Sequence, residues 1–256
     1  MKKDIKVKEY IVNNIGRDLT SREIHLAYDL IDMMHENYSR KEILESFKHN
    51  LEFIKNSKLE TIEFGKIEKF KVKRVSPIHN LHSESVIEYH IFHNKTIIST
   101  FGLFFTVDKN KAVTLRISNI QGYVNKTNHI NKEHVLNTSR EYLNKINKEL
   151  KENWRVKVVS FLKHFSEKNK LNFSLELPSK TGYKKLEYIR QLRQYIQTGL
   201  KAGLKIEQFS TRHINDVEIK KRIENNFEIK KKRLLDSKNK KVVSKKIVKK
   251  NIVKRR

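Results

Sequence analysis

The sequence contains no cysteine, only two prolines and only seven glycines. The absence of cysteine excludes disulfides, thiolate metal sites and cysteine nucleophiles. Few glycines leave little scope for a phosphate-cradling loop, and neither a Walker pattern nor a Gly-x-Gly-x-x-Gly pattern occurs. No run approaches the roughly eighteen apolar residues of a transmembrane helix, and the first residues lack the apolar stretch of a secretion signal. We therefore expect a cytoplasmic protein without a transmembrane segment.

Acidic residues are scarce beside basic ones. The 256-residue chain has 56 Lys and Arg against 29 Asp and Glu, a formal net charge of +27. Such a charge attracts polyanions, including nucleic acid, ribosomal surfaces and anionic lipid. However, lysines outnumber arginines three to one, and a genome rich in A and T produces that bias without selection for binding. Both explanations of the charge stay open.

The first sixty residues carry two helix-start signals. Residues 20–23 read Thr-x-x-Glu and residues 39–42 read Ser-x-x-Glu, and apolar residues at helical spacing follow each capping box. We expect an N-terminal helical segment over residues 1–60, built as a helical hairpin. A DNA-binding helix-turn-helix is one interpretation of this pair. Glutamates occupy the second helix where a DNA reader needs cations, which favours a hairpin that serves packing.

The middle of the chain, residues 61–235, has the pattern of an α/β (or α+β) domain. β-branched and aromatic runs separated by Asn-Lys turns occupy residues 86–122, which predicts a central antiparallel β-meander. A helical pattern around Trp154 precedes an alternating strand at residues 171–177, and further helical patterns follow. This order predicts helices backing one sheet, with a crossover helix that returns the chain to the meander.

Residues 236–256 form a Lys-rich segment that we expect to be a disordered basic tail. Its paired Val and Ile residues recur every five positions, which gives no amphipathic face on a helix or a strand. The tail suits sequence-independent contact with phosphates and has no aromatic residue to stack on bases. A solvated end and a membrane-surface role are the alternatives. The candidate nucleic-acid contacts here are Lys240, Lys241, Lys245, Lys246, Lys249, Lys250, Lys254, Arg255 and Arg256.

A second group of cations lies in the predicted helices before the tail. Tyr188 and Tyr195 are interleaved with them, as in many nucleic-acid surfaces. A solvated helix face explains the same pattern, so both interpretations stand. The candidate nucleic-acid contacts in this group are Arg190, Arg193, Arg212, Lys220, Lys221 and Arg222.

Histidines are the most plausible metal ligands in the sequence. They occur as two His-x-x-His pairs, at 79–82 and 90–93. His90 and His93 are an odd number of residues apart on or beside a strand, which tends to place them on opposite faces. We therefore expect ordinary polar surface, no metal site and no cofactor. His90 with Glu88 is a possible acid/base pair, but no nucleophile accompanies it, so the pattern does not decide whether the protein is an enzyme.

One stretch resembles a known family. Residues 86–177 combine a strand that ends in Ile120-Gln121-Gly122, a later helix that ends near Phe165, and a strand at Phe173. This arrangement resembles the core of VirK-type proteins, which have an acetyltransferase-like α/β fold. The resemblance implies that fold and implies Gln121 and Gly122 as ligand-lining residues, without an established reaction. The glycine-rich acetyl-coenzyme A loop of true acetyltransferases is missing.

Three functional hypotheses follow. The first is a protein that associates with nucleic acid or ribonucleoprotein through the Lys-rich tail and the basic helical face. The second is an acetyltransferase-like, VirK-like module that binds a small or peptidyl ligand near Gln121. The third is a structural protein of a mobile element, with no ligand.

Overall fold

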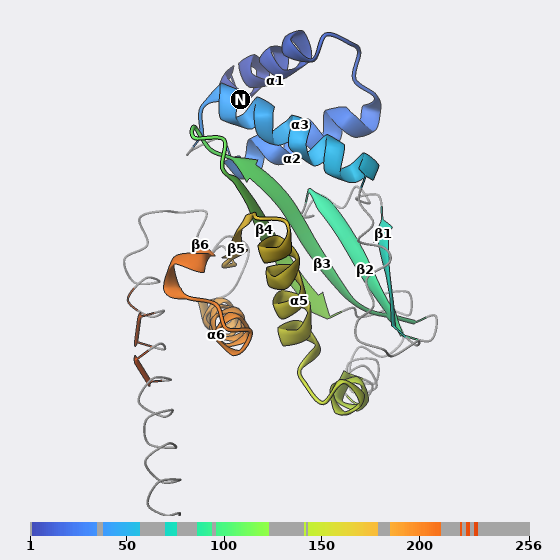
Figure 1. The fold of residues 1–256 in the computed structure, drawn as a ribbon, viewed down its shortest axis with the longest axis vertical. Helices are drawn as coiled ribbons and strands as arrows, with labels where there is room; N and C mark the ends of the chain where they lie inside the picture. Colours follow the sequence, from blue (N-terminus) through green and yellow to red (C-terminus); the bar gives the residue numbers. More distant parts are fainter. Residues whose placement is uncertain are drawn as a thin grey trace, which may run out of the picture.

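Figure 1 shows the protein as a computed structural model. The structure describes residues 2–34, 38–56, 70–75, 86–93, 96–122, 141, 143–178, 185–210, 221, 224–225 and 228–229. Its helices are α1 (Lys2–Ile15), α2 (Ser21–Met34), α3 (Arg40–Asn56), α5 (Trp154–Lys168) and α6 (Lys185–Lys201), with a short 3-10 turn at Ile206–Gln208. Its strands are β1 (Phe70–Val75), β2 (Ile87–His93), β3 (Thr96–Val107), β4 (Val113–Gly122), β5 (Asn172–Glu176) and β6 (Phe209–Ser210).

The described strands form one mixed sheet in the order β1-β2-β3-β4-β5-β6. The first four pair antiparallel with their sequence neighbours, which confirms the predicted meander. After α5 the chain returns as β5, parallel to β4, and after α6 as β6, parallel to β5. The α/β fold class is therefore as the sequence predicts, with helices backing the sheet (Figure 1).

Both predicted capping boxes form. The amide of Glu23 donates to Thr20 Oγ1 at 3.3 Å, and the amide of Thr20 donates to Glu23 Oε2 at 2.9 Å. Ser39 and Glu42 repeat this exchange at the start of α3, at 3.3 and 2.7 Å. Hydrogen bonds from Arg17 also hold the pKa of Glu23 at about 2, with Thr20 assisting and burial opposing. An additional helix, α1, precedes the predicted hairpin.

The helix α3 supplies side chains that continue the pairing of β3. Ile87, the first residue of β2, pairs with Leu103, so β3 extends past the end of its neighbour. Asn50 takes the place of a strand there: the amide of Phe105 donates to Asn50 Oδ1 at 3.0 Å, and Asn50 Nδ2 donates to the carbonyl of Phe105 at 2.8 Å. One side chain thus satisfies both backbone polar groups of a buried residue, as a neighbouring strand does.

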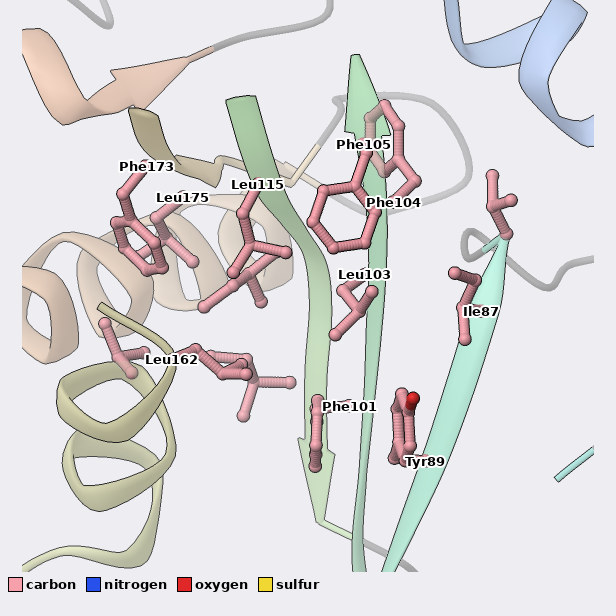
Figure 2. Close-up of a cluster of buried hydrophobic side chains, with 14 of the residues drawn as sticks. Ile87, Tyr89, Phe101, Leu103, Phe104, Phe105, Leu115, Leu162, Phe173 and Leu175 are labelled. Atoms are coloured by element: carbon pink, nitrogen blue, oxygen red, sulfur yellow. The ribbon is translucent and has the colours of Figure 1, made fainter. Parts of the chain in front are cut away.

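The core lies between the sheet and the helices α5 and α6. Figure 2 shows Leu103, Leu115 and Phe173 gathered on one sheet face with Leu162 of α5. The helix α6 packs on the same face, where a Cβ at Gly199 would lie 2.6 Å from the ring of Phe209. This close approach explains why a glycine stands inside a helix, where it otherwise lowers stability.

The buried core also includes apolar residues of the N-terminal helices. Ile11, Leu30 and Phe47 are fully buried and belong to the same contact cluster as the sheet residues. Phe53 of α3 contacts both Phe105 of β3 and Phe165 of α5, with ring centroids 4.5 and 6.4 Å apart. These contacts join α3 to the sheet and to α5, over the end of β3 (Figure 1).

Candidate nucleic-acid and ligand sites

The basic helical face predicted from sequence is present on α6. Arg190, Arg193 and Lys201 are exposed, together with Gln197 between them. Their spacing of three or four residues places them on one side of the helix. Among the described residues, none of these three cations has an ion pair or a hydrogen bond, so their charge faces solvent. A single acidic residue, Glu187, is exposed near them on α6.

The tyrosines interleaved with these cations face the other way. Tyr188 and Tyr195 are each 8% exposed and belong to the core cluster. The backbone amide of Ile120 donates to the hydroxyl oxygen of Tyr195 at 2.9 Å. The tyrosines are therefore structural and provide no stacking surface beside the α6 cations.

The other predicted nucleic-acid contacts are divided between described and undescribed residues. Lys221 is helical and exposed. Arg212, Lys220 and Arg222 lie outside the described residues, as do His79, His82 and the tail residues 236–256. The interface hypothesis therefore rests structurally on the α6 cations.

The predicted ligand-lining residues Gln121 and Gly122 end the strand β4, where they pair with Thr100 and Ser99 of β3. On its other side, β4 pairs with β5 over residues 114–117. In the described sheet, β4 therefore continues beyond its parallel partner. The hydroxyl of Tyr195 takes one of the free edge amides, that of Ile120. The pairing of the two strands ends at Ile117 and Leu175, and in many α/β folds ligands bind beyond the carboxyl ends of the strands.

An arginine lies at the start of α5. Asn153 caps this helix by accepting from the amide of Arg155 at 3.0 Å. The Arg155 guanidinium lies over the ring of Trp154, 4.7 Å from its centroid. Burial lowers the pKa of Arg155 and the nearby Tyr195 opposes that shift. Its buried Nε has no hydrogen-bond partner among the described residues.

A buried charge cluster lies on the sheet face opposite α5. Arg116 Nη1 lies 2.5 Å from Glu176 Oε1, Nη2 donates to the hydroxyl of Tyr38 at 2.7 Å, and Nε donates to Thr106 at 3.0 Å. Burial disfavours the charged guanidinium, but Glu176 and Tyr38 outweigh it and raise the pKa of Arg116. Ser210 of β6 also accepts from Arg116, at 3.1 Å. The cluster ties the loop before α3 to the four strands β3, β4, β5 and β6.

Sequence reasoning missed this cluster. Glu176 is the last residue of β5, and the residues around it at positions 173–177 are otherwise Phe, Ser, Leu and Leu, all of them buried. A carboxylate in such a strand needs a buried cation. Arg116 is a cation in the middle of another apolar strand, so its position in the sequence could have indicated the partner of Glu176.

The histidines do not converge in the described structure. His90 Nε2 lies 3.4 Å from Glu88 Oε1, while His93 pairs through its backbone with Phe70 and Thr96. Within the described ranges, no group of three or more His, Asp or Glu side chains is placed to hold a metal ion.

Comparison with protein-family models, with curated proteins and with solved structures gave no match. Of the helices in the described parts of the chain, none is long and apolar enough to cross a bilayer.

Proposed function

We propose that this protein associates with nucleic acid or ribonucleoprotein through contacts to backbone phosphates. The observation that carries the proposal is the exposed face of α6, where Arg190, Arg193 and Lys201 lie on one side of the helix without acidic partners among the described residues. A net charge of +27 strengthens the attraction of this face for polyanions.

The geometry favours contact with the backbone over reading of bases. Eleven residues separate Arg190 from Lys201, so the cations extend over about 16 Å of helix. Arginine binds phosphate oxygens through two parallel N–H donors. The exposed α6 face holds no aromatic side chain, since Tyr188 and Tyr195 are buried. Binding is therefore independent of sequence and depends steeply on salt. The Lys-rich tail adds phosphate contacts of the same kind.

The test uses the full chain and two matched double variants. Arg190→Gln with Arg193→Gln removes two charges from the α6 face. Arg22→Gln with Arg40→Gln removes two charges from exposed arginines of α2 and α3. Affinity for a duplex of mixed sequence is measured over a series of salt concentrations. Each lost phosphate contact lowers the slope of log K against log salt by about 0.9.

The α6 variant is expected to reduce that slope by about 1.8, which is roughly a twelvefold change in relative affinity over a fourfold change in salt. The control variant is expected to keep the slope of the wild type. Deleting residues 237–256 is expected to reduce it further. Equal slopes for the two double variants, or no binding at low salt, would refute the proposal.

A second candidate function is an acetyltransferase-like, VirK-like module that binds a small or peptidyl ligand at the carboxyl end of β4. Two observations favour it: β4 continues past β5 beside Gln121 and Gly122, and Arg155 has an unpartnered buried donor. The resemblance of residues 86–177 to VirK-type proteins supports the same location.

Trp154 gives this second candidate a direct readout, because it is the only tryptophan and contacts Arg155. Acetyl-coenzyme A, as the probe, is expected to change Trp154 fluorescence with a saturable dose dependence. Arg155→Gln should weaken that response, while Lys157→Gln, two residues further along α5 and so on another side of the helix, should not. A flat titration with the wild-type chain removes the acetyltransferase-like version of the hypothesis.

A further inference from the structure

The strand β2 places an acid and a base on the sheet face away from α5. Ile87, Tyr89 and Ile91 are buried in the core, so the alternating residues Glu88 and His90 face the other side. His90 Nε2 lies 3.4 Å from Glu88 Oε1, and the two side chains are 11% and 19% exposed. Both side chains are therefore mostly buried, and Glu88 is the more exposed of the two.

On the neighbouring strand β3, the residue that pairs with Glu88 is a glycine and has no side chain. Gly102 of β3 pairs with Glu88 on one side and with Asn119 of β4 on the other. Glu88 and Asn119 are therefore two strands apart, about 10 Å between backbones. The position between them carries only a glycine, so nothing from β3 projects into the space that separates the two side chains.

The strand β4 is irregular at this point. Ile117 pairs with Leu103 and Asn119 pairs with Gly102, so Ser118 is an extra residue in a β-bulge. Bulges often occur next to functional sites, where they redirect side chains. Asn119 is 7% exposed and Ser118 is 4% exposed.

Two buried oxygens of the bulge lack partners. Asn119 Oδ1 and Ser118 Oγ accept no hydrogen bond from any described residue. Native structures pair nearly all buried polar atoms, so adjacent exceptions call for an explanation. Arg116, two residues before Ser118 on the same strand, does not provide one, because it donates to Glu176, Tyr38, Thr106 and Ser210 and to neither of these oxygens.

We propose that Glu88, Asn119 and Ser118 form a binding site, over Gly102, for a ligand that presents a primary ammonium group. The three N–H donors of the ammonium group match three acceptors: the Glu88 carboxylate, Asn119 Oδ1 and Ser118 Oγ. Its single positive charge matches Glu88, since Glu176 is already paired with Arg116. Burial strengthens such charge-assisted hydrogen bonds. The site lies on the sheet face opposite α6, so it does not depend on the proposed binding of nucleic acid.

The test titrates the isotope-labelled full chain with methylammonium chloride and, at equal ionic strength, with tetramethylammonium chloride. The two ions carry the same charge, but tetramethylammonium has no N–H donor. We expect the backbone resonance of Gly102 and the side-chain resonances of Asn119 to shift and saturate with methylammonium alone.

Three variants sharpen the result. Glu88→Gln is expected to weaken methylammonium binding about tenfold or more, the loss typical of one hydrogen bond to a charged group. Glu52→Gln, at an exposed glutamate of α3, should leave it unchanged. Asn119→Asp keeps the oxygen, adds a negative charge and should tighten binding; it also decides the matter if Glu88→Gln does not fold. Equal shifts with both ions, or equal binding by Asn119→Asp and wild type, would overturn the proposal.

Discussion

Asn50 is the residue whose replacement tests the packing of α3 against the sheet most sharply. The side chain is fully buried and bonds both the amide and the carbonyl of Phe105. Asn50→Leu fills a similar volume without a polar group, so water does not replace the lost partners. Each backbone group left unpaired in the interior costs about 1–3 kcal/mol. Allowing for the gain from burying an apolar side chain, the variant is expected to lose about 2–4 kcal/mol.

Urea denaturation followed by Trp154 fluorescence measures this loss. With a denaturant dependence of about 2 kcal/mol per molar, a loss of about 3 kcal/mol lowers the unfolding midpoint by roughly 1.5 M. Asn56→Leu makes the same substitution at an exposed position at the end of α3 and should leave the midpoint nearly unchanged. If Asn50→Leu unfolds within about 0.3 M of the wild type, the side chain does not substitute for a strand at the edge of β3.

Three further predictions concern stability. Because the pKa of Glu23 is lowered to about 2 in the folded protein, its stabilising effect is fully present above about pH 4.5 and is lost as the pH falls toward 2. Glu23→Gln should remove that part of the acid sensitivity, about 1 kcal/mol after allowance for solvent screening. Gly199→Ala should lower stability by about 1–3 kcal/mol, since the new methyl group overlaps the ring of Phe209. Tyr38→Phe should cost about 1.5 kcal/mol, because Arg116 loses a hydrogen-bond acceptor.

Each of these predictions has its own check. For Glu23 the readout is the unfolding free energy as a function of pH, and Glu45→Gln should keep the wild-type curve; a curve for Glu23→Gln that parallels the wild type below pH 4.5 contradicts the argument. For Gly199 the neighbour Gln197→Ala should be neutral or slightly stabilising, and a stabilised Gly199→Ala would show that the ring moves freely. For Tyr38, an unchanged melting temperature would show that water replaces the hydroxyl.

Local signals predicted most of the fold. The Thr-x-x-Glu and Ser-x-x-Glu patterns located the starts of α2 and α3 because a capping box depends only on residues three positions apart. The β-branched and aromatic runs between Asn-Lys turns in residues 86–122 predicted the meander because such residues favour strands and such turns join them. The order of helix and strand patterns predicted the return through the crossover helix α5, but it did not decide that β5 runs parallel to β4.

The sites needed tertiary information. Asn50 contacts Phe105, 55 residues away, and Arg116 contacts Glu176, 60 residues away; no local pattern reports such distances. For α6, in contrast, the helical spacing of the residues was enough to predict which side chains face the core. Tyr188 and Tyr195 share a face with Leu192 and Gly199, and that face is the buried one. Treating these tyrosines as interleaved with Arg190 and Arg193 overlooked the periodicity that separates them.

Photocrosslinking at the centre of the α6 face reports whether nucleic acid binds there. Benzoylphenylalanine in place of Gln197 lies between Arg193 and Lys201, while the same group in place of Asp32 lies on the exposed side of α2. We predict that irradiation at low salt crosslinks nucleic acid to the chain at position 197 and not at position 32, and that raising the salt abolishes the product. Equal crosslinking at both positions, or none at position 197 under conditions where the chain binds, would contradict a phosphate-binding face on α6.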